Sequence, residues 1–191
     1  MNWLPLTLPD RYEHDGIEFV PLTPALLHAD YAAVMRDIPM LRAWSGQDWP
    51  TPEFTAAENL LDLERHDREQ RDRVALTYSV LLGGAVQGCI YVHPFEQAWR
   101  TRDLDPPVLA VGDVAVRGWL HDRPAVDLVQ ATLNFLSAPR FAFPRLWWQT
   151  NDHCPAQIDA CERLGLTDEL SVDGTDRRWL TRAAPENGTQ L

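Results

Sequence analysis

The chain has 191 residues, enough for one domain with a substantial core and too few for two of ordinary size. Hydrophobic residues make up 45% of it, a globular composition that excludes a largely disordered protein. The formal net charge of −11 argues against a general nucleic-acid-binding protein, which needs clustered lysine and arginine. This acidity fits either general solubility or a cationic amine substrate.

The cysteines and the N-terminal sequence indicate the compartment. Cys89, Cys154 and Cys161 have neither a disulfide-framework nor a zinc-site spacing, which favours a reducing cytoplasm and no bound metal. No basic segment followed by a long apolar run begins the chain, so neither a signal peptide nor a membrane partner is expected.

The first third of the chain predicts one strand and two helices. We expect an irregular arm over residues 1–16, a strand over 17–22 and a helix that opens at Thr23-Pro24. Residues 41–53 are predicted to form a loop. Thr55 and Glu58 have the spacing of a capping box at the start of the next helix.

That helix carries mostly charged residues after its first turns. Leu60, Leu61 and Leu63 are expected to face inward, and His66 is expected at the surface. Two β-rich runs, 74–82 and 85–92, follow around Gly83-Gly84, which is a strong hairpin signal.

The central unit of the chain reads as strand, turn and helix. Residues 108–117 are apolar on both faces, as in a covered strand. Asp122 is predicted to cap a helix over residues 124–136, with Pro124 in the first turn. The unpaired N–H groups at the start of such a helix form an anion-binding site.

The last third completes the sheet. We expect a strand over residues 145–150, a helix from Pro155 that Gly165 ends, and short strands over 170–172 and 178–181. A frayed tail, 183–191, follows. The order β-α-α-β-β-β-α-β-α-β-β predicts a single α/β domain over residues 1–191, with a mixed, mostly antiparallel sheet and helices on both faces.

This order, together with Ala160-Cys161-Glu162-Arg163-Leu164-Gly165-Leu166, resembles the GNAT superfamily of acyl-CoA-dependent N-acyltransferases. The heptapeptide is similar to the family's L-Y-E-K-L-G-F, and the likeness extends over residues 17–182. The resemblance implies that the central strand and the next one splay apart and bind acetyl-CoA as co-substrate between them. The pantetheine arm is then expected to pair with the backbone at Val114, Ala115 and Val116.

The turn that would bind the pyrophosphate departs from the family pattern. The family has Q/R-x-x-G-x-G/A, whereas this chain offers residues 120–125, of which only Ala125 matches. Pro124 removes an N–H donor and Asp122 adds a like charge. His121 or Arg123 would compensate by contacting phosphate through their side chains.

The reaction that the resemblance implies is direct attack of an amine on the thioester, with a base taking the amine proton. Asp113, a carboxylate inside an apolar strand, is the candidate base, and a structural Asp with a partner is the alternative. His93 is the second candidate base. Cys161 occupies the place of the family's tyrosine acid, either as a thiol acid or as inert packing.

The acceptor site in this fold is walled by the loop between the first two helices, which here contains Trp44, Trp49 and Glu53. Aromatic rings with a carboxylate suit an organic cation, although a lid packed on the core is the alternative for the tryptophans. The predicted function is therefore N-acetyltransfer from acetyl-CoA to a small-molecule amine.

Two alternative functions stay open. One is a GNAT-fold protein that has lost the chemistry and binds a ligand or a partner. An open slot beside Val114 favours the enzyme, whereas a slot filled by Trp119 or Trp147 favours the binding protein. An enlarged cavity would indicate a longer acyl-CoA. Exchange of final strands between two copies would give a homodimer.

Overall fold

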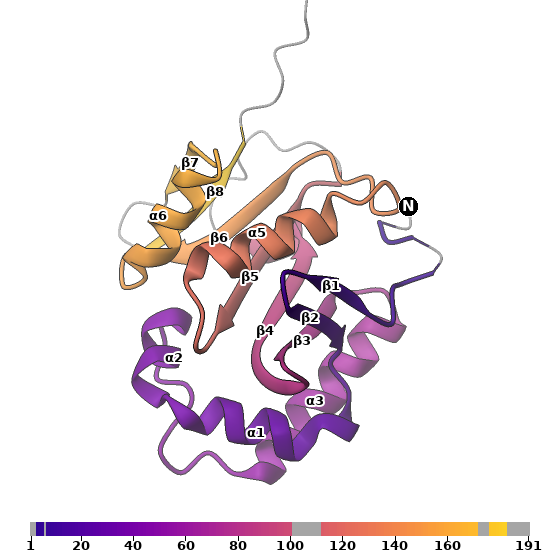
Figure 1. Ribbon diagram of the computed structural model, residues 1–191, viewed down its shortest axis with the longest axis vertical. Helices are drawn as coiled ribbons and strands as arrows, with labels where there is room; N and C mark the ends of the chain where they lie inside the picture. The colour runs from indigo at the N-terminus through magenta and orange to yellow at the C-terminus, as the bar shows by residue number, and fades with distance from the viewer. Residues whose placement is uncertain (1–2, 6, 101–111, 172–175, 183–191) are drawn as a thin grey trace, which may run out of the picture.

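The computed structural model describes residues 3–5, 7–100, 112–171 and 176–182 (Figure 1). The strands are β1 (Tyr12–His14), β2 (Ile17–Pro21), β3 (Leu76–Leu82), β4 (Ala85–Pro94), β5 (Val114–Leu120), β6 (Leu146–Asn151), β7 (Asp168–Ser171) and β8 (Arg177–Thr181). The helices are the 3₁₀ turn η1 (Pro24–Leu26), α1 (Leu27–Arg36), α2 (Ile38–Ser45), α3 (Ala56–Arg71), α4 (Phe95–Arg100), α5 (Ala125–Leu136) and α6 (Pro155–Arg163).

The strands form one mixed sheet in the order β1-β2-β3-β4-β5-β6-β8-β7. Every neighbouring pair is antiparallel except β5 and β6, which are parallel because α5 carries the chain back between them. The predicted fold class, a single α/β domain with a mostly antiparallel mixed sheet, is therefore confirmed.

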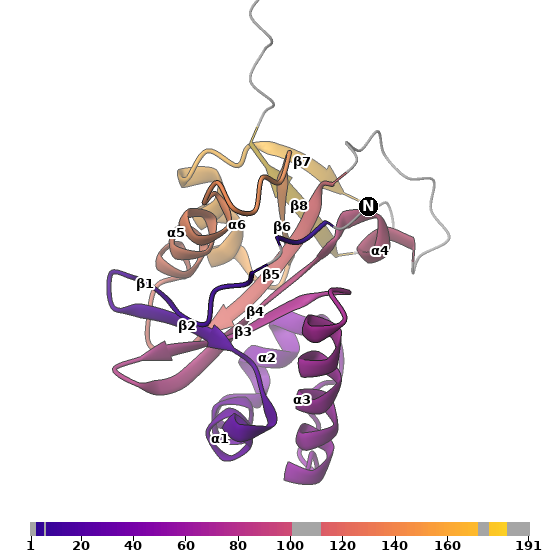
Figure 2. The ribbon, with the colours of Figure 1, turned by 90° about the vertical axis from the view of Figure 1, so that its right-hand side faces the viewer.

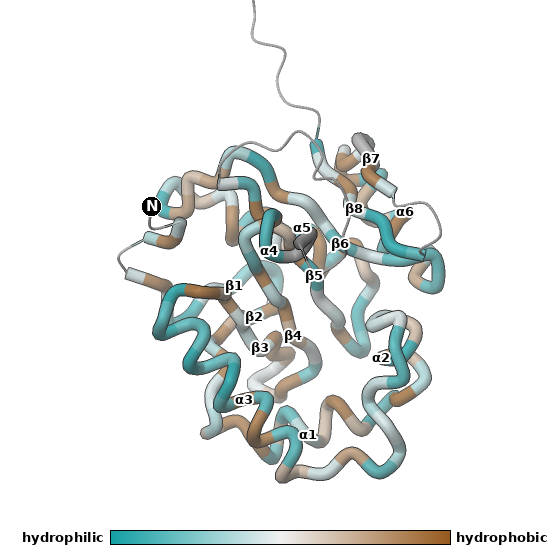
Figure 3. Tube along the Cα trace, turned by 180° about the vertical axis from the view of Figure 1, so that it is seen from behind, coloured by the Kyte–Doolittle hydropathy of each residue, from teal (hydrophilic) through white to brown (hydrophobic). Residues whose placement is uncertain are grey.

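Helices cover both faces of the sheet, and each face has its own core. Figure 2 shows α1 and α3 on one side of the sheet and α5 and α6 on the other. Leu41, Leu63 and Trp119 pack in the α1–α3 core, whereas Val116 and Leu128 pack in the core under α5 and α6. Figure 3 shows α3 as a mostly hydrophilic helix, as expected for one with a solvated outer face.

Two local signals in the sequence are confirmed at atomic detail. Gly83 and Gly84 form the two-residue turn between β3 and β4 with φ of 56° and 83°, a region where glycine is favoured. At the start of α3, the Glu58 N–H donates to the Thr55 hydroxyl oxygen over 3.2 Å. The Thr55 N–H donates to the Glu58 carboxylate over 2.8 Å, which completes the capping box.

Several predicted boundaries were wrong. Residues 38–45 form α2, so residues 41–45 of the predicted loop are helical. The Asp37 carboxylate accepts from the Met40 N–H at the start of this helix, and Gly46 ends it in a left-handed conformation. Residues 12–14 of the predicted arm form β1, and residues 95–100 form α4. The predicted strand residues 108–111 lie outside the described part of the chain.

Candidate functional site

Strands β5 and β6 diverge in the middle of the sheet. Val114, Ala115 and Val116 pair with Leu146–Trp148, and beyond them β5 pairs only with β4 as far as Leu120. Figure 1 shows the two strands parting after this short paired segment. One edge of β5 therefore has no strand partner from residue 117 onward.

The hydrogen-bond register shows which backbone groups face this gap. The Phe95 N–H donates to the Asp113 carbonyl and the His121 N–H donates to the Gln87 carbonyl, so odd-numbered residues of β5 bond to β4. The Val114 N–H donates to the Arg145 carbonyl, toward β6. By alternation, the N–H and C=O groups of Gly118 and Leu120 face the gap.

A side chain from α6 reaches into the gap. The buried Gln157 amide donates to the Gly118 carbonyl over 2.8 Å and accepts from the Trp148 indole over 3.3 Å. Gln157 thus supplies the hydrogen bond that a neighbouring strand would otherwise give. Neither Trp119 nor Trp147 has this role: Trp119 packs in the α1–α3 core and Trp147 packs on Phe95.

The predicted pantetheine-pairing residues do not lie at the unpaired edge of β5. The predicted residues, Val114, Ala115 and Val116, are the ones whose outer edge is already occupied by β6. The edge without a strand partner lies further along β5, at Gly118 and Leu120. The sequence could not locate this shift, because the point where two strands part depends on their twist and packing.

The turn after β5 differs from the prediction. Pro124, not Asp122, precedes the first residue of α5, and Asp122 has φ of 60°. Asp122 instead forms a bidentate ion pair with Arg36 of α1, with distances of 2.6 and 2.7 Å. This pair ties the turn to α1 and offsets the negative charge that Asp122 adds there.

The side chains predicted to contact phosphate already have protein partners. His121 is buried, and its Nε2 lies 3.0 Å from the Ala33 carbonyl oxygen. Arg123 donates to the Asp127 carboxylate over 2.9 Å. Ala125 begins α5, where the unpaired N–H groups of the first turn are available. An anion at this turn would therefore be held chiefly by backbone.

A cavity of about 310 Å³ lies on the α1–α3 side of the sheet, next to the point where β5 and β6 part. The sheet contributes Tyr91, His93 and Arg117 to its lining, and the helices contribute Asp30, Trp44 and His66 among others. Trp49 also lines it, so both predicted tryptophans lie at the cavity. Glu53, the predicted carboxylate, is exposed and outside it.

Asp30 is a cavity carboxylate that the sequence analysis missed. It is buried on α1, accepts a hydrogen bond from the Asn59 amide over 2.8 Å, and has its pKa raised by burial. Its spacing of three and four residues from Ala33 and Val34, both buried, would have placed it on the inner face of α1.

His93 is the predicted base that lines the cavity. Burial, reinforced by the charges of Arg117 and Arg65, lowers its pKa to about 4. His93 pairs across the sheet with Ala115, one residue from the point where β5 leaves β6. It is therefore a neutral imidazole near that point at neutral pH.

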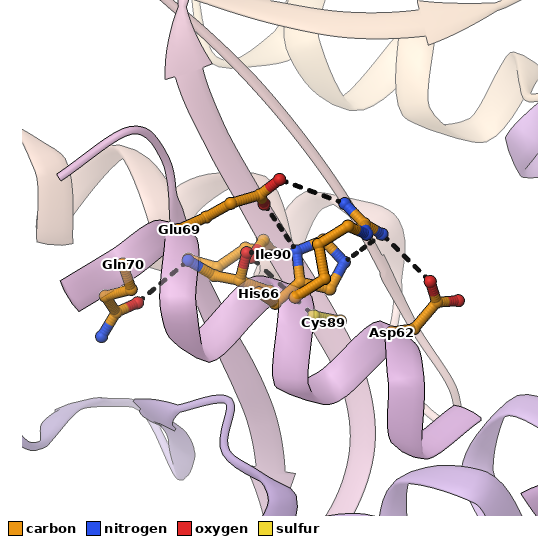
Figure 4. A network of polar contacts seen from close by, with 8 residues as sticks. Asp62, His66, Glu69, Gln70, Cys89 and Ile90 are labelled. Carbon is orange, nitrogen blue, oxygen red and sulfur yellow. Dashed lines mark hydrogen bonds and ion pairs between the residues drawn. The ribbon is translucent and has the colours of Figure 1, made fainter. Parts of the chain in front are cut away.

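His66 was predicted to be exposed, and that prediction was wrong. It lies three residues after Leu63 on α3, so it shares the face that packs on the sheet. Figure 4 shows it at the centre of a polar network. Its Nε2 lies 3.1 Å from an Arg65 nitrogen, and its Nδ1 lies 3.2 Å from the Thr77 hydroxyl.

The network fixes the tautomer of His66. Arginine can only donate, so Nε2 accepts and the proton lies on Nδ1, which faces Thr77 and Glu69. Burial, with the Arg65 charge, lowers the pKa of His66 to about 3. The Glu69 carboxylate is 3.3 Å away, but it is also shared with Arg65.

Asp113, the first predicted base, has a structural environment. Its carboxylate is buried and accepts from Arg145 Nε over 3.0 Å and from the Trp147 indole over 3.2 Å. It lies before the first residue of β5 and is not among the described residues that line the cavity. We infer that Asp113 fixes β6 to the start of β5, the alternative that its sequence context had left open.

The cysteines are poorly suited to proton transfer. Cys161 is fully buried in the core under α5 and α6, and burial raises its pKa to about 12. Burial also raises the pKa of Cys154, which precedes α6. Cys161 is consistent with the packing role that was one of its two interpretations.

No family model matches this sequence, and no curated protein matches it. Solved structures do match its fold. The microcin C7 self-immunity acetyltransferase MccE, in complex with acetyl-CoA and AMP, aligns with a TM-score of 0.66 at 10% identity, covering 91% of this chain and 95% of that one. A protein assigned to the GNAT acetyltransferase family, from Bordetella pertussis, aligns at 0.64 with 17% identity over 92% and 100% of the two chains.

The aminoglycoside acetyltransferase AAC(6')-Ib, in complex with ribostamycin and coenzyme A, aligns at 0.63 with 14% identity, covering 88% and 94%. The chain therefore has the GNAT acetyltransferase fold. In the described ranges, no helix is long and apolar enough to span a bilayer. The same ranges contain no cluster of three or more His, Cys, Asp or Glu suited to a metal ion.

The Asp113 environment predicts a stability role. Asp113→Asn leaves the Arg145 guanidinium facing a neutral amide, so the free energy of unfolding should fall by about 2–4 kcal/mol. Urea denaturation measures this. The control Asp152→Asn removes an exposed carboxylate that pairs with Arg178 and should cost less than about 1 kcal/mol. Equal, small losses in both variants would contradict the structural assignment.

The His66 environment predicts acid sensitivity. Its pKa is about 3 in the folded chain against 6.5 as the ordinary value, so the unfolded chain binds the proton first. The stability it contributes is complete above about pH 6.5 and is lost as pH falls toward 3. At pH 4 the loss should reach about 2–3 kcal/mol.

Denaturation of the wild type and His66→Gln at pH 7 and pH 4 measures this loss. The variant should lose less stability between the two values. His28→Gln, which replaces an exposed histidine of α1, controls for removal of an imidazole. A pH dependence that His66→Gln leaves intact would show that His66 does not titrate in this way.

Proposed function

We propose that this protein is an N-acetyltransferase that transfers an acetyl group from acetyl-CoA to the amine of a small molecule. The observation that carries the proposal is the parting of β5 and β6 beside a cavity with a neutral histidine. The fold similarity to MccE, solved in complex with acetyl-CoA and AMP, and to AAC(6')-Ib, solved in complex with ribostamycin and coenzyme A, supports the same function.

The backbone edge of β5 that β6 leaves unpaired fits a pantetheine arm. Gly118 and Leu120 present alternating N–H and C=O groups to the gap, and an extended amide chain can pair with such an edge as an added strand does. The Gly118 carbonyl accepts from Gln157, so a pantetheine N–H that bonds there competes with this side chain. The pyrophosphate would lie at the start of α5, on backbone N–H groups.

The cavity supplies the acceptor side of the reaction. The amine nitrogen forms a bond to the acetyl carbon, the carbon–sulfur bond breaks, and the amine proton goes to a base. His93 is the group we assign to this role, because it is neutral at pH 7 and lies beside the parting of the strands. The thiolate of coenzyme A takes its proton from water.

Trp44, Trp49 and Tyr91 give the acceptor cavity aromatic walls, and Asp30 gives it a carboxylate. An amine that enters this cavity as an ammonium ion loses one proton to solvent before attack, and His93 takes the second proton during attack. A cavity of about 310 Å³ is in the size range of small-molecule sites. We assign a small-molecule amine, in keeping with the size of the cavity.

A second candidate function is ligand binding without transfer. Gln157 favours it, since this side chain already satisfies the Gly118 carbonyl and fills part of the gap. The turn at Asp122 to Pro124 also lacks the glycines that let backbone approach a phosphate closely. Binding of acetyl-CoA separates the two functions.

Calorimetric titration with acetyl-CoA, with desulfo-CoA as control, tests the proposal. We expect both to bind, and Gln157→Ala to bind acetyl-CoA at least about threefold more tightly, because no side chain then competes for the Gly118 carbonyl. Gln130→Ala, which trims an amide on the outer part of α5, is the matched control. Absence of heat and of any thermal shift at millimolar acetyl-CoA would exclude the acetyltransferase and leave the ligand-binding function.

His93→Gln tests the base. Among amines screened by thiol release from acetyl-CoA, the best acceptor should lose about 10²–10⁴-fold in kcat, with acetyl-CoA binding unchanged. His28→Gln is again the control. Because the pKa of His93 is about 4, wild-type kcat/KM should show no histidine limb between pH 5 and 7. Retention of kcat in His93→Gln would rule out this assignment.

A further inference from the structure

Arg117 occupies a distinctive position in the cavity. It is the first residue of β5 beyond the segment paired with β6, and its side chain lines the cavity on the α1–α3 face. The guanidinium carbon lies 3.9 Å from the centre of the Trp44 ring and 5.9 Å from that of Tyr91. One face of its plane therefore rests on Trp44, which leaves its N–H edge for other partners.

No carboxylate of the described residues forms an ion pair with Arg117, and no hydrogen bond from its guanidinium to them is present. The other cation at the cavity, Arg65, contacts Asp62 over 3.2 Å and Glu69 over 3.4 Å. Asp30 is bonded to Asn59 on the helical wall. Of these two cavity cations, Arg65 thus has carboxylate partners. Arg117 has none among the described residues.

The surroundings make this arrangement costly for the fold. Burial lowers the pKa of Arg117, yet an arginine stays charged at neutral pH. Its histidine neighbours, His66 and His93, are neutral and do not supply an anion. A desolvated cation without a counter-ion destabilises the chain unless a bound group compensates it. This free-energy cost indicates that Arg117 has a binding role, because proteins retain locally destabilising residues mainly at functional sites.

We propose that Arg117 binds the carboxylate of the acceptor, so that the substrate is an amino-acid-like molecule carrying both an amine and a carboxylate. A planar guanidinium with a free edge matches a carboxylate in two parallel N–H···O bonds. Stacking on Trp44 holds the fork in one orientation. The amine half of this assignment rests on the proposed function, whereas carboxylate recognition does not.

Calorimetry without acetyl-CoA tests the carboxylate site directly. The probes are N-acetyl-L-leucine, N-acetyl-L-methionine and N-acetyl-L-phenylalanine, each paired with its primary amide. These probes carry apolar side chains suited to the aromatic walls. In the wild type, at least one free acid should bind ten times more tightly than its amide. Arg117→Gln should abolish that preference, and Arg117→Lys should retain only part of it, because lysine keeps the charge and loses the fork.

Arg71→Gln is the matched control. It removes the same charge from an exposed ion pair with Asp67 on α3, outside the cavity, and should leave the preference unchanged. Phosphoethanolamine, titrated in parallel, separates a carboxylate site from a phosphate site. Tighter binding of phosphoethanolamine, or no acid preferred over its amide, would overturn the proposal. Failure of acetyl-CoA to bind would affect the proposed function alone.

Thermal unfolding without ligand tests the premise independently of the binding measurements. If Arg117 is an uncompensated cation, Arg117→Met should raise the midpoint of thermal unfolding by about 2–4 °C in the absence of ligand. A fall in the midpoint would show that Arg117 has a structural counter-ion and would overturn the premise.

Discussion

The structure depends on a parallel pairing that stops early. Val114–Val116 pair with β6, and the strands then separate, so the middle of the sheet contains backbone groups without a strand partner. Buried polar groups of this kind must find partners, and here Gln157 satisfies the Gly118 carbonyl. The same parting opens the sheet beside the cavity under α1–α3. In the function that we propose, backbone recognition of acetyl-CoA and side-chain recognition of the acceptor would both arise from this one irregularity.

The electrostatics of the cavity follow from its burial. Desolvation lowers the pKa of His93 and His66 and raises that of Asp30. Arg117 is also desolvated, and no carboxylate of the described residues forms an ion pair with it. These groups are held by packing on aromatic rings and by second partners such as Asn59. A site arranged in this way holds its charges before a ligand arrives and needs little reorganisation when one binds.

Much of the fold could be predicted from the sequence because its signals are local: the turn at Gly83-Gly84 and the Thr55 cap act within a few residues. The candidate site was harder to predict from the sequence, because its residues come together only through tertiary packing. Trp44 and Trp49, which the sequence predicted as walls of an acceptor site, both line the cavity. Asp113 was assigned from its apolar neighbours, yet its partner Arg145 lies on another segment, which one sequence cannot reveal. No sequence pattern pointed to Gln157, because its role is to hydrogen-bond the Gly118 carbonyl where β5 and β6 separate.

Amide hydrogen exchange across β5, with and without acetyl-CoA, tests the central claim most directly. The amides of Val114 and Val116 face β6 within the paired segment and should exchange slowly in both states. Gly118 and Leu120 should exchange faster alone and become protected when acetyl-CoA is added. Unchanged exchange at both residues, under conditions where acetyl-CoA binds, would contradict the claim that the open edge of β5 holds this substrate.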